Sequence, residues 1–139
     1  MSGGRNVTRN IAIVCGEFHR DEVEKMLEFA QAEATAQNLE VTQVVWVPGS
    51  MEAPLALQRL LENWEIDAAI VLGIIEKGET GHGATMGYAV TDAVIRLQLE
   101  TGKPIGLGII GPGAEPEHIP PRLEPHARNA VAAVASMLE

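Results

Sequence analysis

The sequence has 139 residues, enough for one domain with an ordinary hydrophobic core. Its formal net charge of −9 argues against a general nucleic-acid-binding surface, which requires a positive field. Cys15 is the only cysteine, so no disulfide framework can form, and we expect its thiol to be a core group rather than a nucleophile. No apolar run reaches the roughly 18 residues of a membrane span, and residues 1–9 lack a secretion signal's apolar core. We expect a single cytoplasmic domain over residues 1–139, with residues 1–9 as a flexible N-terminal segment.

The first half of the chain predicts two strands and two helices in alternation. An almost wholly apolar strand covers residues 10–15, and a helix capped by Asp21, with Glu24 as its capping-box partner, follows to about residue 38. A second strand covers residues 39–47, and Ser50 is expected to cap the next helix. The apolar residues expected on the buried side of that helix are Leu55, Leu57, Leu60, Leu61 and Trp64.

The second half repeats this alternation. The expected elements are a strand over 66–72, a helix to about 101, a strand over 103–110, a Gly/Pro-rich loop over 111–121 and a helix over about 125–138. The apolar stripe expected on the first of these helices contains Met86, Ala89, Val90, Ala93, Val94 and Leu97. Strands and helices that alternate four times with short connections predict a parallel sheet covered by helices on both faces.

Gly106, Gly108 and Gly111 match the spacing of a dinucleotide-binding G-x-G-x-x-G motif. That motif has meaning only where it follows a strand and opens a helix, whereas the first two of these glycines lie inside a predicted strand. Glycine inside a strand more often indicates close packing of backbone or subunits. We therefore do not expect a dinucleotide site.

A polar turn rich in glycine, residues 73–83, follows the third strand. Its position is where open α/β sheets bind their ligands. Glu79 and Thr80 lie just before a helix, so free N–H groups there could face an anion. His82 is the side chain of this turn that is suited to proton transfer near neutral pH, although alone it would also fit a solvated loop histidine.

Two other loops are expected at the same edge of the sheet. Phe18 and His19 follow the first strand, and residues 48–52 follow the second. Phe18 could be a stacking surface for a flat heterocycle or could pack on the following helix. Glu52 could bind hydroxyl groups or could simply cap a helix.

Together these loops resemble the lumazine synthase family. The matching residues are Phe18, the segment Val47-Pro48-Gly49-Ser50-Met51-Glu52-Ala53-Pro54, and Gly73 with Lys77-Gly78-Glu79-Thr80-Gly81-His82. The resemblance covers nearly the whole chain, and Gly111-Pro112-Gly113 is similar to the archaeal members. It implies an α/β fold, a three-layer α/β/α sandwich whose four-stranded parallel sheet has the flavodoxin-like order 2-1-3-4. It also implies a transferase that forms 6,7-dimethyl-8-ribityllumazine in riboflavin biosynthesis.

The resemblance assigns roles around the heterocyclic substrate, 5-amino-6-(D-ribitylamino)uracil. Phe18 would stack on its ring, and His19 occupies a position where asparagine is usual. The residues expected to bind the ribityl chain are Ser50, Met51 and Glu52. The residues whose backbone is expected to bind the ring are Ile74, Ile75 and Glu76.

The second substrate, 3,4-dihydroxy-2-butanone 4-phosphate, would bind at the turn after the third strand. Its phosphate would bind the main chain of Glu79 and Thr80, and His82 would transfer protons. A neighbouring subunit would supply a ring cover, a phosphate anchor and a basic contact: Leu107, Arg122 and Arg128. The resemblance further implies a homo-oligomer, a pentamer or a 60-subunit shell, with no cofactor, metal, nucleic acid or membrane partner.

Some residues depart from the family pattern, and other functions stay open. Met51 and Leu107 stand where aromatic residues are common, and arginine replaces the usual lysine at position 128. An archaeal-type riboflavin synthase and a non-catalytic shell homologue are alternatives within this fold. A receiver domain is disfavoured, because the first strand is followed by only one acid, Glu17, and Gly73 stands where an aspartate is needed.

Overall fold

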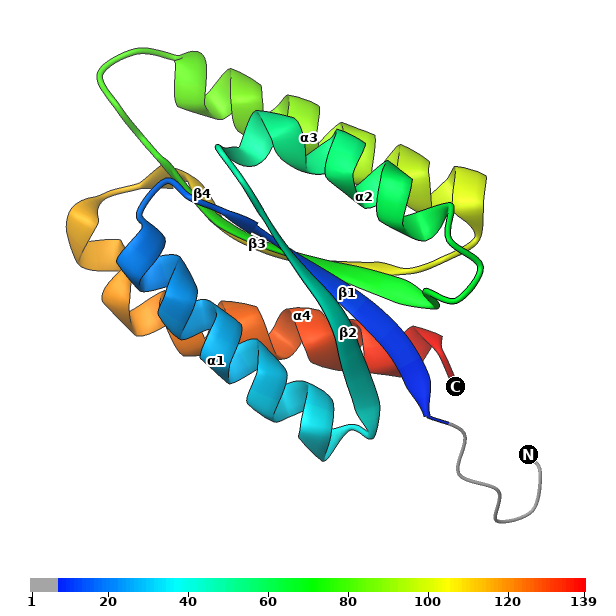
Figure 1. The fold of residues 1–139 in the computed structure, drawn as a ribbon. Helices are drawn as coiled ribbons and strands as arrows, with labels where there is room; N and C mark the ends of the chain where they lie inside the picture. The colour runs from blue at the N-terminus through cyan, green and yellow to red at the C-terminus, as the bar shows by residue number, and fades with distance from the viewer. Residues whose placement is uncertain (1–7) are drawn as a thin grey trace.

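The structure, a computed structural model, describes residues 8–139. Four parallel strands form one sheet in the order β2-β1-β3-β4, with helices on both faces (Figure 1). The strands are β1 (Arg9–Gly16), β2 (Leu39–Val47), β3 (Ala68–Glu76) and β4 (Ile105–Ala114). The expected three-layer α/β/α sandwich and its flavodoxin-like strand order are confirmed.

Two helices cover each face of the sheet. One layer, below the sheet in Figure 1, consists of α1 (Arg20–Ala36) and α4 (Leu123–Met137), and the other consists of α2 (Ala53–Leu61) and α3 (His82–Thr101). Three short 3₁₀ helices complete the connections: η1 (Ser50–Glu52), η2 (Pro116–His118) and η3 (Pro120–Arg122).

The two central strands are apolar and buried along most of their length, with polar residues only at the start of β1 and the end of β3, because both of their faces are covered. Successive side chains of a strand point to opposite faces. Ile13 of β1 and Ile70 of β3 accordingly pack under α1 and α4, whereas their neighbours Val14 and Val71 pack under α2 and α3. The core therefore consists of two apolar layers, one on each side of the sheet.

The strands on the β4 side are longer at their carboxyl ends than predicted. β3 continues to Glu76, which pairs with Ala114 of β4, and the N–H of Lys77 donates to the Ala114 carbonyl over 3.0 Å. β4 runs through a cis Gly111–Pro112 bond into what was expected to be loop. The Gly/Pro-rich composition suggested irregular backbone, but pairing with β3 satisfies these main-chain groups. At the other end of the chain Arg9 belongs to β1, and residues 1–7 of the expected flexible segment lie outside the described residues.

The predicted helix caps are wrong. α1 begins at Arg20 after His19, whose backbone is left-handed, and no side chain caps it. Asp21 therefore lies inside the first turn, where its charge is still favoured by the helix dipole. Ser50 opens the 3₁₀ helix η1 instead of capping α2, which begins at Ala53.

The expected apolar faces of the α2/α3 layer are only partly buried. Leu57, Leu60 and Leu61 are buried, but Leu55 is 51% and Trp64 is 85% exposed. α2 ends at Leu61, so Trp64 is beyond the helix and outside its periodicity. On α3, Val90, Val94 and Leu97 are buried whereas Ala89 is exposed.

The glycines inside β4 are sites of close packing, as the sequence predicted. A Cβ on Gly106 would overlap the carbonyl oxygen of Ala130 in α4. A Cβ on Gly108 would lie 2.7 Å from Cδ2 of Leu72. Gly106 therefore allows α4 to approach β4 closely, and Gly108 leaves room for the Leu72 side chain of β3.

Candidate active site

The loops after β1, β2 and β3 meet at the carboxyl edge of the sheet. The N–H of Glu17, after β1, donates to the carbonyl of Val47 at the end of β2 over 2.8 Å. Gly16 is enclosed by both neighbouring strand ends, since a Cβ there would lie 3.8 Å from the Leu72 oxygen and 3.9 Å from the Gly49 carbonyl carbon. The ends of the three strands therefore lie side by side, as expected from the parallel sheet.

His19 connects the loop after β1 to the end of β3. Its Nε2 contacts Oε1 of Glu76, and its Nδ1 lies 3.9 Å from Oε1 of Glu22. The φ angle of His19 is 60°, a left-handed conformation that asparagine, aspartate and histidine adopt more readily than other non-glycine residues. The backbone conformation thus accounts for a histidine at a position where the resemblance makes asparagine usual.

Phe18 presents its ring at this edge. The side chain is 56% exposed, and its ring meets that of His19 edge-on, with centroids 4.6 Å apart and planes at 76°. An exposed ring does not fit the alternative in which Phe18 packs on the following helix. His19 contacts one side of this ring, and more than half of the Phe18 side chain stays accessible for stacking.

The segment after β2 forms the short helix η1. Ser50 faces β3, because a Cβ on Gly73 would lie 3.5 Å from the Ser50 Oγ. Met51 and Glu52 are exposed. Glu52 occupies the N-cap position of α2, but its side chain makes no capping hydrogen bond, so this carboxylate has free acceptor oxygens.

The end of β3 contributes backbone rather than apolar side chains. Ile74 and Ile75 are buried, and Glu76, half-buried, is the first side chain of this strand to reach the edge. α3 packs closely against this strand end, since a Cβ on Gly83 would lie 2.5 Å from the Glu76 carbonyl oxygen and 3.3 Å from that of Lys77. Gly83 is therefore required by the approach of α3 to β3.

The turn between β3 and α3 is exposed. Glu79, Thr80 and His82 all face solvent, and His82 is the first residue of α3. The Thr80 hydroxyl accepts a hydrogen bond from the His82 N–H over 3.2 Å. The N–H of Thr85 donates to the Gly81 carbonyl over 3.1 Å, which begins the helical hydrogen bonding. The amino end of α3 thus opens into the turn where an anion was expected to bind.

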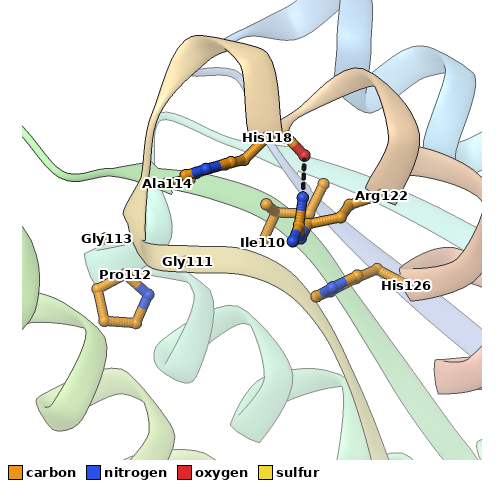
Figure 2. Close-up of a pocket in the computed structure, with 8 residues that line it drawn as sticks. All are labelled: Ile110, Gly111, Pro112, Gly113, Ala114, His118, Arg122 and His126. Carbon is orange, nitrogen blue, oxygen red and sulfur yellow. Dashed lines mark hydrogen bonds between the residues drawn. The ribbon is translucent and has the colours of Figure 1, made fainter.

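A pocket lies at the end of β4, as Figure 2 shows. This pocket has a volume of about 230 Å³. Arg122, at the end of η3, extends into it, and its Nη1 donates to the carbonyl of His118 over 2.9 Å. The lining residues are Ile110, Gly111, Pro112, Gly113, Ala114, His118, Arg122 and His126. The predicted phosphate anchor is therefore in a pocket of its own, after a different strand from Phe18, Glu52 and His82.

The other two residues expected to act in a neighbouring subunit are far apart in the sequence and differ in setting. Leu107 lies on the edge strand β4 and is 40% exposed. Arg128 lies on α4 and is paired with Glu33 of α1 at 3.2 Å and with Glu124 at 2.7 Å. The Gln37 amide and the Arg128 guanidinium hold the pKa of Glu33 below its ordinary value. Within one chain, Arg128 therefore connects α4 to α1.

The sequence interpretation did not assign a role to the two histidines of the β4 pocket. His118 and His126 stand four residues before and four residues after Arg122. On a regular helix that spacing would place all three on one face. The spacing of these three residues did not indicate a shared helix face, because the Pro120-Pro121 pair predicts a break in any helix through Arg122.

Residues 8–139 contain no group of three His, Cys, Asp or Glu side chains arranged to hold a metal ion. In the same part of the chain, no helix has the length and apolar character needed to cross a membrane.

Comparison with known proteins bears on the whole arrangement. The protein-family model for 6,7-dimethyl-8-ribityllumazine synthase matches residues 8–139. The chain belongs to the lumazine synthase family. Similar proteins named 6,7-dimethyl-8-ribityllumazine synthase include one from Staphylothermus marinus, 41% identical over 128 residues, which are 92% of this chain and 85% of that protein. The relative from Metallosphaera sedula is 41% identical over 91% of this chain and 84% of its own length. The relative from Saccharolobus solfataricus is 39% identical over 93% of this chain and 84% of its own length.

Membership of the lumazine synthase family makes this chain an enzyme with a transferase-type reaction. The match begins at residue 8, next to the start of β1, and includes all four strands and the loops described above. Both the three-loop edge and the β4 pocket therefore lie within the family domain.

Proposed function

We propose that this chain condenses 5-amino-6-(D-ribitylamino)uracil with 3,4-dihydroxy-2-butanone 4-phosphate to give 6,7-dimethyl-8-ribityllumazine in riboflavin biosynthesis. The observation that carries the proposal is the exposed Phe18 ring, which lies at the same sheet edge as Glu52 and the turn that bears His82. Such an edge offers a stacking surface, a hydroxyl acceptor and a proton carrier. Membership of the lumazine synthase family supports the same reaction.

The reaction needs proton transfer at every stage. The uracil amine attacks the ketone, and water leaves to give an imine. Removal of the neighbouring carbon's proton then expels phosphate, and the resulting enol rearranges to a ketone. The ribityl-bearing nitrogen closes the ring on this ketone, and a second water leaves. A histidine accepts and returns protons near neutral pH, and His82, exposed at the start of α3, is assigned this role.

The uracil substrate is assigned to the β1–β3 side of the edge. Its ring stacks on Phe18, and His19, through its contact with Glu76, holds the loop that carries Phe18. The strand end formed by residues 74–76 offers main-chain groups to the ring. The residues assigned to the ribityl chain are Ser50, Met51 and Glu52. Glu52, whose carboxylate is not used as a helix cap, accepts from the hydroxyls.

The phosphate substrate is assigned to the turn before α3 and to a basic side chain from another copy. The main chain of Glu79 and Thr80 binds the phosphate at the amino end of α3. Arg122 of a neighbouring copy is the anchor, since a guanidinium matches phosphate geometry. Leu107, exposed on the edge strand, covers the ring, and Arg128 adds positive charge nearby. Most of the catalysis then comes from holding the two substrates together.

The active unit is a homo-oligomer, a pentamer or a 60-subunit shell, with its sites between subunits. The separate location of the Arg122 pocket, after β4, supports a site completed by two copies. Exposed apolar residues on α3 support a covered face. The enzyme acts in the cytoplasm. It uses no cofactor or metal, because the chemistry needs only proton transfer and substrate positioning.

The direct test is to incubate the protein with both substrates and to follow product absorbance. In a parallel reaction, the lumazine product is the sole substrate. Lumazine formation from the two-substrate mixture is expected. Riboflavin formation from lumazine alone would instead indicate a riboflavin synthase. No product in either reaction would indicate a non-catalytic shell protein.

His82→Ala is expected to lower kcat by about 100-fold, the usual contribution of a positioned general acid–base group. Added imidazole should restore part of the rate, since it replaces the lost proton carrier. The variant should keep the wild-type sedimentation coefficient, because the side chain is exposed. An unchanged kcat would remove His82 from this role.

A further inference from the structure

The segment between β4 and α4 is held in shape by His118. The His118 main-chain N–H donates to the Glu115 carbonyl over 2.9 Å, and the Glu115 N–H donates to Nδ1 of the His118 ring over 3.0 Å. The His118 side chain thus has the place in a capping box that is usually taken by glutamate or glutamine. To accept this hydrogen bond, Nδ1 must be unprotonated, so the ring carries its proton on Nε2.

The same residue holds Arg122 through its backbone. The carbonyl of His118 accepts from Nη1 of Arg122 over 2.9 Å, and the Arg122 N–H donates to the Ile119 carbonyl over 3.0 Å. Figure 2 shows the guanidinium beside Ile110, between His118 and His126. Arg122 has no carboxylate partner among residues 8–139, in contrast to the doubly paired Arg128. The hydrogen bond to the His118 carbonyl therefore orients the Arg122 guanidinium.

We propose that His118 is a positioning residue for Arg122: its imidazole closes the turn, and the carbonyl thus placed holds the guanidinium in the β4 pocket for the substrate's phosphate. The inference rests on the proposed function, which makes Arg122 the phosphate anchor. Arginine has a long side chain with several rotatable bonds, so binding an anion costs the entropy of fixing it. A guanidinium already oriented avoids part of that cost, and the gain appears as affinity for the phosphate substrate.

The test compares His118→Ala with His118→Asn, because an asparagine Oδ1 can accept the Glu115 N–H from nearly the position of Nδ1. His118→Ala is expected to raise KM for the butanone phosphate about tenfold, while kcat and KM for the uracil change by less than about twofold. His118→Asn is expected to recover most of the loss. A KM that is unchanged in His118→Ala, or equally raised in both variants, would overturn the inference.

A double-mutant cycle with Arg122→Ala separates positioning from a direct contact. Because His118 acts through Arg122, His118→Ala should add nothing once the guanidinium is absent. An additive effect would show that His118 acts on its own and would refute the proposal.

Binding of inorganic phosphate, measured by titration calorimetry on the assembled protein, gives a readout that does not need turnover. Arg122→Ala and His118→Ala should both weaken it, and His118→Asn should not. If Arg122→Ala has no effect on phosphate binding or on KM, the anchor role fails and the inference fails with it. If only His118→Ala has no effect, the proposed function stands and His118 has no positioning role.

Discussion

The two helix layers share the same sheet but differ in their outer surfaces. In the α1/α4 layer the exposed side chains are charged, polar or small, apart from Met137 at the end of α4, and Arg128 joins the two helices through Glu33. In the α2/α3 layer, large apolar side chains face water: Leu55, Tyr88, Ile95 and Leu99. The three on α3 are spaced by seven and four residues, so they form one stripe on the side opposite the core.

This difference shows that the two layers do not have the same relation to solvent. Contiguous apolar surface is uncommon on soluble monomers and usually marks an interaction site. The α2/α3 layer has a stripe of large apolar side chains on its outer face that a second copy would cover, and the α1/α4 layer has no such stripe. The comparison supports the proposed homo-oligomer and adds the outer face of α3 to the contacts proposed for Leu107, Arg122 and Arg128.

The largest expected effect comes from placing a charge in the apolar stripe of α3. Leu99, 80% exposed, contributes little to the fold of one chain, so Leu99→Glu should leave the circular dichroism spectrum unchanged. Burying an unpaired carboxylate between copies is costly, and assembly should fail. Sedimentation should then give the 14.9 kDa single chain. Activity should fall by more than about 100-fold, because the site needs a second copy.

The matched control is Ala32→Glu on the exposed side of α1. It adds the same charge to the other layer and should change neither mass nor rate. If both variants assemble and react like the wild type, the proposed difference between the layers is wrong.

A smaller effect is expected from adding a methyl group where each layer meets β4. Gly106→Ala should destabilise the protein by about 3 kcal/mol, because the new Cβ meets the main chain of α4, which cannot move aside. In Gly87→Ala the Cβ would lie 2.5 Å from Cγ of Pro112, but alanine also favours the helix by about 1 kcal/mol, so the net loss should be about 1–2 kcal/mol. Urea unfolding at one fixed protomer concentration measures both. Equal losses would show that β4 contacts the two layers equally tightly.

The smallest effect concerns the single thiol, which lies under the α1/α4 layer. Burial raises the pKa of Cys15 from 9.0 to about 12. Below pH 9 both folded and unfolded thiols are protonated, so no stability is lost. Above pH 9 the unfolded thiol ionises first, and the free energy of unfolding should fall by about 1.4 kcal/mol per pH unit. By pH 10 the expected loss relative to pH 8 is about 1.4 kcal/mol.

Urea midpoints of the wild type and Cys15→Ala between pH 8 and pH 10 test this, since the variant should lack this component of the slope. A thiol reagent at pH 8 should label the native protein slowly and the urea-unfolded protein fully. Fast labelling of native protein would mean that the α1/α4 layer opens readily.

Much of the fold could be predicted because each element has a strong local pattern. The apolar run before Gly16 indicates a buried parallel strand, and the spacing of Val90, Val94 and Leu97 indicates a helix with one buried face. The helix starts were less predictable. Asp21 is a residue type that often caps helices, but α1 begins one residue before Asp21, at Arg20, directly after the left-handed backbone of His19.

The candidate site also has features that the sequence predicts and features that it does not. The positions of Phe18, Glu52 and His82 after three parallel strands were enough to place them at one edge. The contact between His19 and Glu76 and the hold of His118 on Arg122 were not predictable. The first joins residues 57 positions apart, and the second depends on a backbone carbonyl that carries no residue signal.

The sequence by itself determined the alternation of strands and helices, the two-sided burial of the sheet and the loops that meet at its carboxyl edge. These properties follow from periodicity within single elements, which the backbone geometry of helix and strand imposes locally. The tertiary structure alone decided that β4 continues to Ala114, that Arg122 has its own pocket and that the stripe of Tyr88, Ile95 and Leu99 faces outward. Those outcomes depend on which elements pack together, and packing joins residues that no local pattern connects.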